Sequence, residues 1–143
     1  MVLVAPSFAT DVDFINIHFQ GSLFDVTYSL YGRPIYSLWM QGTIISLNYD
    51  QGVFDFDDGT GRILQIKLMH SNMNSENVAK YTVKCHMGSQ VGQLVSIVCG
   101  LSHIIMKNDA LLCLKLLRIS SSQYFHRDYW NYMVKIWRLE AHN

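Results

Sequence analysis

The chain has 143 residues, of which 50% are hydrophobic, and it carries no net charge. This length fits a single domain with a hydrophobic core of its own. A protein that holds nucleic acid unaided usually has a basic excess, because phosphate neutralisation supplies much of its affinity. Zero net charge therefore argues against that class of protein.

Charged residues are few and unevenly distributed. They make up 15% of the chain, against 13% for aromatic residues, so we expect a partner to cover part of the apolar surface. Residues 1–58 hold seven acids and one base, and the remainder holds ten bases and four acids. This predicts one acidic and one basic rim. The basic rim is either ordinary solvated surface or a face that guides a DNA-bearing or acidic partner.

The first 34 residues contain two strand-like segments. Ile15, Ile17 and Phe19 alternate with polar residues, as in a strand with one buried face, and Leu23 to Leu30 also favours a strand. Residues 1–34 are therefore either an N-terminal hairpin packed on the following domain or an extension that becomes ordered on a partner.

Residues 35–68 are predicted to form three antiparallel strands joined by tight turns. Gly42 interrupts the long first strand and marks a bulge or a sharp bend. In the second strand Phe54 and Phe56 alternate with acids, which predicts that the rings point inward. A glycine-containing turn, Asp58-Gly59-Thr60-Gly61, leads into the third strand. A long bent strand followed by such a meander suggests an OB-type barrel.

The remainder supplies two further strands and a helix. A polar loop is predicted at His70 to Lys80, with a short strand possible at Tyr81 to Met87, and apolar runs at Leu94 to Leu101 and Ala110 to Ile119 read as strands. Lys107-Asn108-Asp109 is predicted to turn the chain between the two runs. The predicted fold class is all-β with a C-terminal α-helix: a five-stranded OB-fold barrel over residues 35–120, followed by a dimerisation helix within residues 121–143.

The C-terminal helix carries two overlapping apolar stripes. Ser120, Ser121 and Ser122 are candidate N-cap residues. One stripe, which we expect to close the barrel, has helical spacing and consists of Phe125, Tyr129, Tyr132, Met133, Ile136 and Leu139. The other stripe consists of Trp130, Met133 and Trp137. We expect this second stripe to pack on another protein, since interface cores are enriched in Trp, Tyr and Met.

Enzymatic and metal sites are not predicted. The sequence lacks the P-loop, G-x-S-x-G and H-E-x-x-H motifs. The three cysteines have no C-x-x-C spacing, so we expect reduced thiols in a cytosolic or nuclear protein rather than disulfides or zinc. Adjacent Cys85 and His86 would face opposite ways on a strand. His103 in an apolar strand is expected to be a core residue, so we predict no catalytic residue, cofactor or metal.

Several short motifs, in one order, resemble the RecQ-mediated genome instability protein 2 family over roughly residues 22–140. The tetrapeptide Trp39-Met40-Gln41-Gly42 is the distinctive one, and the others are common to OB folds of the replication protein A type. These others are Asp57-Asp58-Gly59-Thr60-Gly61, Val91-Gly92-Gln93-Leu94-Val95 with Gly100, Cys113-Leu114-Lys115-Leu116-Leu117-Arg118, and Trp130 in the terminal helix.

The resemblance implies a nuclear, non-catalytic subunit that pairs, helix to helix, with an OB domain like that of RecQ-mediated genome instability protein 1. Such a pair would join topoisomerase III and a RecQ helicase to dissolve double Holliday junctions in recombination and DNA repair. The resemblance also implies that Trp130 lies at the partner surface and that Arg118 replaces a family lysine. Lys115 is a weaker candidate, since three residues along a strand should place it on the opposite face. The predicted partner-binding residues are Lys115, Arg118, Tyr129, Trp130, Met133, Ile136 and Trp137.

The alternative function is a replication protein A-like or telomere-capping OB subunit that binds single-stranded DNA within a complex. Such domains stack bases on exposed aromatic side chains of the second and third barrel strands. If Phe54 and Phe56 point inward, the exposed face carries Asp55 and Asp57 instead and would repel phosphate. We therefore expect weak or no DNA binding by the isolated chain.

Overall fold

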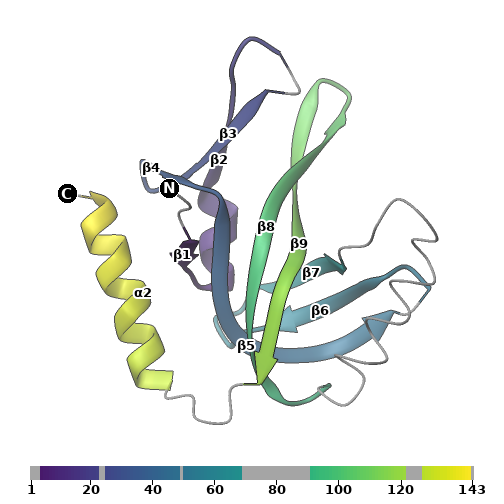
Figure 1. Ribbon diagram of the computed structural model, residues 1–143, viewed down its shortest axis with the longest axis vertical. Helices are drawn as coiled ribbons and strands as arrows, with labels where there is room; N and C mark the ends of the chain where they lie inside the picture. Colours follow the sequence, from purple (N-terminus) through teal and green to yellow (C-terminus); the bar gives the residue numbers. More distant parts are fainter. Residues whose placement is uncertain (1–3, 23–24, 49, 69–90, 122–126, 143) are drawn as a thin grey trace.

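The computed structural model describes residues 4–22, 25–48, 50–68, 91–121 and 127–142 (Figure 1). The loop expected at His70 to Lys80, the strand expected at Tyr81 to Met87, and Cys85, His86, Ser122 and Phe125 lie outside these residues. Within them, no helix combines the length and the apolar character that crossing a membrane requires.

Five strands close into a barrel in the order β5–β6–β7–β9–β8, with β8 pairing back onto β5. All neighbours are antiparallel except β7 and β9, which run parallel. This is the topology of an OB fold, so the predicted fold class is confirmed. The barrel strands are β5 (Ser37–Asn48), β6 (Val53–Asp57), β7 (Ile63–Leu68), β8 (Leu94–Met106) and β9 (Asp109–Ser121).

Alternation along the strands determines which side chains fill the barrel. Phe54 and Phe56 are at most 1% exposed, while Asp55 and Asp57 between and after them are partly exposed. The inward orientation expected for the two rings is therefore confirmed. The same alternation in β7 buries Leu64, Ile66 and Leu68.

The long strand β5 bends and therefore pairs with two neighbouring strands. Its first half pairs with β8 and its second half pairs with β6. The register shift lies between Ile44 and Ser46, two or more residues after Gly42. Gly42 has a different role, because a Cβ there would approach the Asp57 carbonyl oxygen to 2.6 Å and the Asp58 Cα to 2.8 Å. The glycine thus permits close packing of β5 on the end of β6.

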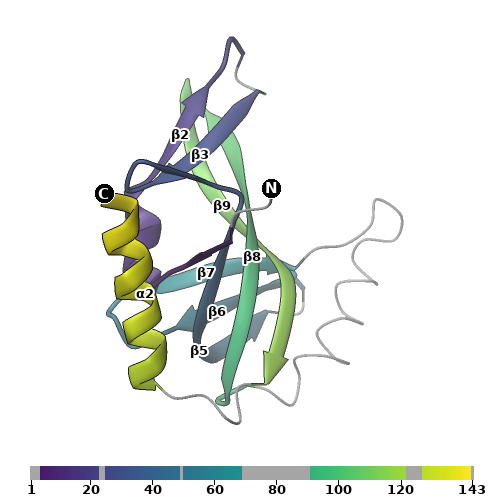
Figure 2. The same ribbon diagram turned by 60° about the vertical axis from the view of Figure 1, so that its left-hand side comes forward.

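Strands β8 and β9 form a long hairpin that extends beyond the barrel (Figures 1 and 2). Its turn residues Lys107 and Asn108 both have positive φ, at 49° and 66°, as a two-residue hairpin turn requires. The expected turn and the strand assignment of Ala110 to Ile119 are confirmed. Ser120 and Ser121 continue β9 instead of capping a helix, because they pair with Ser96 and Val95.

The N-terminal segment forms a small sheet of its own, in the order β2–β3–β4. Within it, β2 and β3 pair antiparallel as a hairpin. It contacts the extended β8–β9 hairpin, where the Tyr28 hydroxyl lies 2.9 Å from His103 Nδ1. His103 was expected in the core, but it is only half-buried and lies on the extended hairpin, where it contacts Tyr28. The N-terminal elements are β1 (Val4–Pro6, parallel to β5), the 3₁₀ helix η1 (Ala9–Phe14), β2 (Ile15–Phe19), β3 (Val26–Leu30) and β4 (Arg33–Ile35).

Candidate partner interface

The C-terminal helix α2 (Arg127–His142) packs on the outside of the barrel through one face only. Trp130 and Val134 are 3% and 1% exposed. The indole of Trp130 meets that of Trp39 edge to face, with ring centroids 4.8 Å apart, and Trp39 Nε1 donates to Ser96 Oγ at 2.6 Å. Trp137 is half-buried against the core, with the Arg33 guanidinium 5.2 Å from its ring.

The expected assignment of the two stripes was therefore wrong. Trp130, expected to face a partner, lies on the inner face against the chain's own barrel, whereas Trp137 packs partly on the core and also lines the groove on the outer side of α2. Of the described side chains expected to close the barrel, Tyr129, Tyr132 and Leu139 are each more than 60% exposed. The error has a physical cause: the helix is apolar over most of its circumference, so spacing alone does not select the buried stripe.

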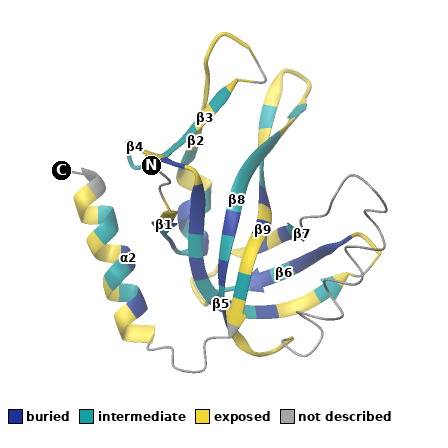
Figure 3. Cartoon of the chain, in the orientation of Figure 1, coloured by how far each residue is buried: buried dark blue, intermediate teal, exposed yellow. Residues whose placement is uncertain are grey.

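The outer face of α2 consists of Tyr129, Tyr132, Met133, Ile136 and Leu139. Tyr129, Tyr132 and Leu139 are each more than 60% exposed, although they are large and largely apolar. A groove of about 280 Å³ runs along this face and includes Pro6 and Glu140 in its lining. In Figure 3 most of α2 has the exposed and intermediate colours. Contiguous apolar surface of this kind marks protein interaction sites.

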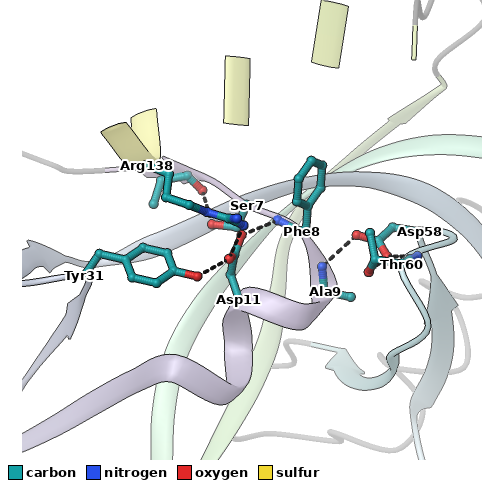
Figure 4. Close-up of polar contacts among 9 residues, drawn as sticks. Ser7, Phe8, Ala9, Asp11, Tyr31, Asp58, Thr60 and Arg138 are labelled. Carbon is teal, nitrogen blue, oxygen red and sulfur yellow. Dashed lines mark hydrogen bonds and ion pairs between the residues drawn. The ribbon is translucent and has the colours of Figure 1, made fainter. Parts of the chain in front are cut away.

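A buried carboxylate fixes the C-terminal end of α2 (Figure 4). Asp11 in η1 is 2% exposed and accepts hydrogen bonds from the Phe8 backbone N–H at 2.8 Å and the Tyr31 hydroxyl at 2.5 Å. Arg138 of α2 forms an ion pair with the same carboxylate, and its guanidinium lies over the rings of Phe8 and Tyr31. Burial, together with the hydrogen bond to Asp11, raises the pKa of Tyr31 to about 12.

The acidic turn after β6 lies near the N-terminal end of α2. Asp58 accepts from the Ala9 backbone N–H at 2.6 Å and from the backbone and hydroxyl of Thr60, and Asp57 accepts from the Gly59 backbone N–H. Arg127 Nη2 donates to the Asp58 carbonyl oxygen at 3.4 Å. The two carboxylates thus form hydrogen bonds within the predicted turn and to η1.

Lys115 and Arg118 lie on β9, away from α2. Both are exposed, and in both views β5 and β8 separate their strand from the helix. They share the outer face of β9, whereas the sequence predicted opposite faces. The reason is a bulge: Cys99 pairs with Leu116 and Val98 with Arg118, which leaves Leu117 as an extra residue between them. The partner-binding residues predicted from the sequence therefore fall on two separate surfaces and the inner face of α2.

The outer face of β6 and β7 has the wrong chemistry for stacking nucleic-acid bases. Neither strand, and both are described in full, places an aromatic side chain outward. Asp55 is exposed there and accepts from Ser46 Oγ at 2.9 Å. The nearby Arg62 is already paired with Asp13 at 3.2 Å. Single-strand binding sites combine aromatic platforms with a cationic groove. This face has no aromatic platform, and its cation Lys67 shares the face with the acids Asp55 and Asp57.

The closed barrel, with its bent first strand and the C-terminal helix, defines an OB-fold protein. Comparison with solved structures agrees. A chain of the S. pombe Stn1–Ten1 complex superposes with a TM-score of 0.58 at 16% identity, covering 95% of this chain and 97% of that one. A chain of a replication protein A heterotrimer bound to single-stranded DNA also gives a TM-score of 0.58, at 11% identity, covering 97% and 94%. At these identities the likeness is one of fold. No protein-family model and no curated protein sequence matches the chain.

Proposed function

We propose that this chain is a non-catalytic OB-fold subunit that pairs with an OB-fold partner through the outer face of α2. The observation that carries the proposal is the exposure of Tyr129, Tyr132 and Leu139 on a helix whose opposite face is already buried. Tyr and Met are enriched in interface cores, and an amphipathic helix commonly binds in an apolar groove of its partner. In the isolated chain this second apolar face of α2 is left exposed.

Two kinds of nuclear complex are candidates for the assembly. A replication protein A-like or telomere-capping complex is favoured by the fold, because the similar solved chains come from the Stn1–Ten1 complex and from a heterotrimer bound to single-stranded DNA. A RecQ helicase–topoisomerase III complex that dissolves double Holliday junctions is favoured by the sequence motifs around Trp39 and Gly59. In both cases the chain acts as a scaffold, and the acidic outer face of β6 keeps its own contribution to DNA affinity small.

A pull-down of the tagged chain from its native cells, followed by mass spectrometry, tests pairing and distinguishes the two complexes. We expect an OB-fold partner, accompanied either by single-strand-binding subunits or by topoisomerase III and a RecQ helicase. The Leu139→Asp variant should lose this partner. The matched variant Leu111→Asp changes a similarly exposed leucine on β9 and should retain it. Recovery of the same partner by both variants, or of none by the unmodified chain, would contradict pairing through α2.

A separate measurement addresses DNA. We expect the isolated chain to bind a single-stranded oligonucleotide weakly, because the outer face of β6 and β7 has no aromatic side chain for stacking and places Asp55 and Asp57 beside its basic residue Lys67. Fluorescence anisotropy over a salt series measures this directly. Tight binding that weakens steeply with salt would favour a direct DNA-binding role over the scaffold role.

A further inference from the structure

The hairpin of β8 and β9 has two faces that differ in their surroundings. On its inner face, Leu101 and Leu112 pack against the core and His103 contacts Tyr28 of the N-terminal sheet. Directly opposed residues of an antiparallel pair point to the same side, so the register identifies the residues of the opposite, outer face. The side chains of this outer face include Ile104 and Met106 of β8 and Leu111, Lys115, Leu117 and Arg118 of β9.

Four large apolar side chains of the outer face are exposed. Ile104 and Leu111 oppose each other across the two strands and are 43% and 50% exposed, and Met106 beside them is 52% exposed. Leu117, nearer the barrel, lies over Gly100 and is 54% exposed. Single exposed apolar side chains are ordinary, whereas a group of them on one sheet face marks an interaction site.

Two cations lie at the barrel end of this face. Lys115 points outward by the alternation of β9, and the bulge at Leu117 brings Arg118 to the same side, where a regular strand would turn it inward. Both cations are exposed, and neither side chain forms an ion pair or a hydrogen bond with another described residue. The only acid in the sequence of β8 and β9 is Asp109, which lies at the far end beside the turn. The positive charge of Lys115 and Arg118 is therefore not neutralised within the hairpin.

We propose that the outer face of the β8–β9 hairpin binds an acidic peptide segment of a second partner protein. Carboxylates of the segment pair with Lys115 and Arg118, and its apolar side chains cover Leu117 and the opposed pair of Ile104 and Leu111. Charge complementarity selects this occupant, because unpaired cations beside apolar surface are matched by carboxylates beside apolar side chains. The bulge in β9 then has a function, since it alone brings the second cation to this face. The face is separate from α2, so the inference does not rest on pairing through the helix.

Nucleic acid and membrane lipid match this face less well. Neither β8 nor β9 contains a Phe, Tyr or Trp on which a base could stack. Segments that bind anionic membranes carry clusters of about four to eight cations, whereas the hairpin has Lys115, Arg118 and, in its turn, Lys107. A peptide supplies both carboxylates and aliphatic side chains and is therefore the favoured ligand.

Fluorescence anisotropy of a labelled synthetic peptide, titrated with the full chain, tests the proposal. The probe consists of repeated Glu-Leu-Asp units. One control peptide replaces every leucine by serine, and another replaces every acid by lysine. We expect saturable binding of the probe, about tenfold weaker binding of the serine peptide because it lacks apolar side chains, and no binding of the basic peptide.

Variants of the chain locate the binding and separate it from pairing through α2. Leu111→Asp should weaken binding of the probe about tenfold, and the double variant Lys115→Ser, Arg118→Ser about fivefold. Leu139→Asp on α2 is the matched control and should bind the probe as the unmodified chain does. This pattern is the reverse of that expected for the OB-fold partner, so the two proposals can fail independently.

Several results would overturn the proposal. These are no binding of the probe, equal binding of the acidic and basic peptides, or equal affinity of the Leu111→Asp variant and the unmodified chain. Tighter binding of a single-stranded oligonucleotide or of phosphatidylserine vesicles, abolished by Leu111→Asp, would assign the face to nucleic acid or to membrane instead. A homodimer that light scattering detects and that Leu111→Asp dissociates would assign it to a second copy of the chain.

Discussion

Arg138 in α2 is ion-paired with Asp11 in η1, across 127 positions of the sequence. The Asp11 side chain is 3% exposed and that of Arg138 is 35% exposed. The partly exposed guanidinium therefore covers a buried carboxylate at the edge of the barrel. This contact sets the rotation of α2 about its own axis. It acts together with the Trp130–Trp39 contact, which turns the same side of the helix inward and leaves Tyr132 outward.

Replacing Asp11 should destabilise the fold strongly. The Asp11→Asn substitution keeps the size of the side chain but removes the charge that Arg138 and Tyr31 share, and we expect a loss of about 3 kcal/mol in the free energy of unfolding. Urea denaturation measures it. The control is Asp13→Asn, which breaks the exposed pair with Arg62 and should cost less than about 1 kcal/mol. Equal losses in the two variants would refute a special role for Asp11.

Tyr31 should make stability fall at high pH. Its pKa is raised from the ordinary value of 10.0 to about 12 in the folded chain. A raised pKa means that the neutral hydroxyl is favoured by folding, so this contribution is complete below pH 10 and is lost as the pH rises towards 12. Urea midpoints at pH 8 and pH 11 should differ more for the unmodified chain than for Tyr31→Phe. The Phe variant keeps all other tyrosines and thiols, so an identical difference would argue against the assignment.

The two faces of α2 should respond differently to truncation. Trp130→Ala removes a fully buried indole from its contact with Trp39 and should cost about 3–5 kcal/mol. Tyr132→Ala changes a side chain that is 62% exposed and should change the stability of the isolated chain by no more than about 0.5 kcal/mol. Thermal unfolding followed by circular dichroism compares them. A large loss in the Tyr132 variant would mean that the outer face is buried in the isolated chain.

Gly42 should not tolerate a side chain. In Gly42→Ala the added Cβ would meet backbone atoms of Asp57 and Asp58 at 2.6 and 2.8 Å, which cannot move aside without opening the β5–β6 junction. We expect a loss of about 1–3 kcal/mol. Gly100→Ala is the control, since its nearest neighbour is the flexible end of Leu117 at 3.2 Å. That variant should be neutral or slightly stabilised, and denaturant midpoints would distinguish the two outcomes.

The barrel was accessible to sequence analysis because its strands keep a strict alternation. Phe54 and Phe56 against Asp55 and Asp57 identify the inner and outer faces of β6 without any knowledge of its neighbours. The turn at Lys107 and Asn108 was recognisable for a similar local reason. These two features are set by residues adjacent in sequence and were therefore predicted correctly.

Features set by distant contacts were not predicted. Which stripe of α2 is buried depends on the pairing of Arg138 with Asp11. The sequence around either residue does not indicate that the two will pair. The bulge at Leu117 likewise depends on how β9 pairs with β8, and it alone brings Lys115 and Arg118 to one face. The strand β1 has only three residues, too few to show a period, and becomes a strand by pairing with β5.

The pairing of Arg138 with Asp11 also constrains the order in which the protein can fold during synthesis. The ribosome adds Asp11 long before Arg138. The Asp11 carboxylate therefore lacks its ion-pair partner until α2 has left the exit tunnel. Contacts of such large sequence separation form late. The outer face of α2 can therefore take its final orientation only after Arg138 has been made, and all five barrel strands precede it in the chain.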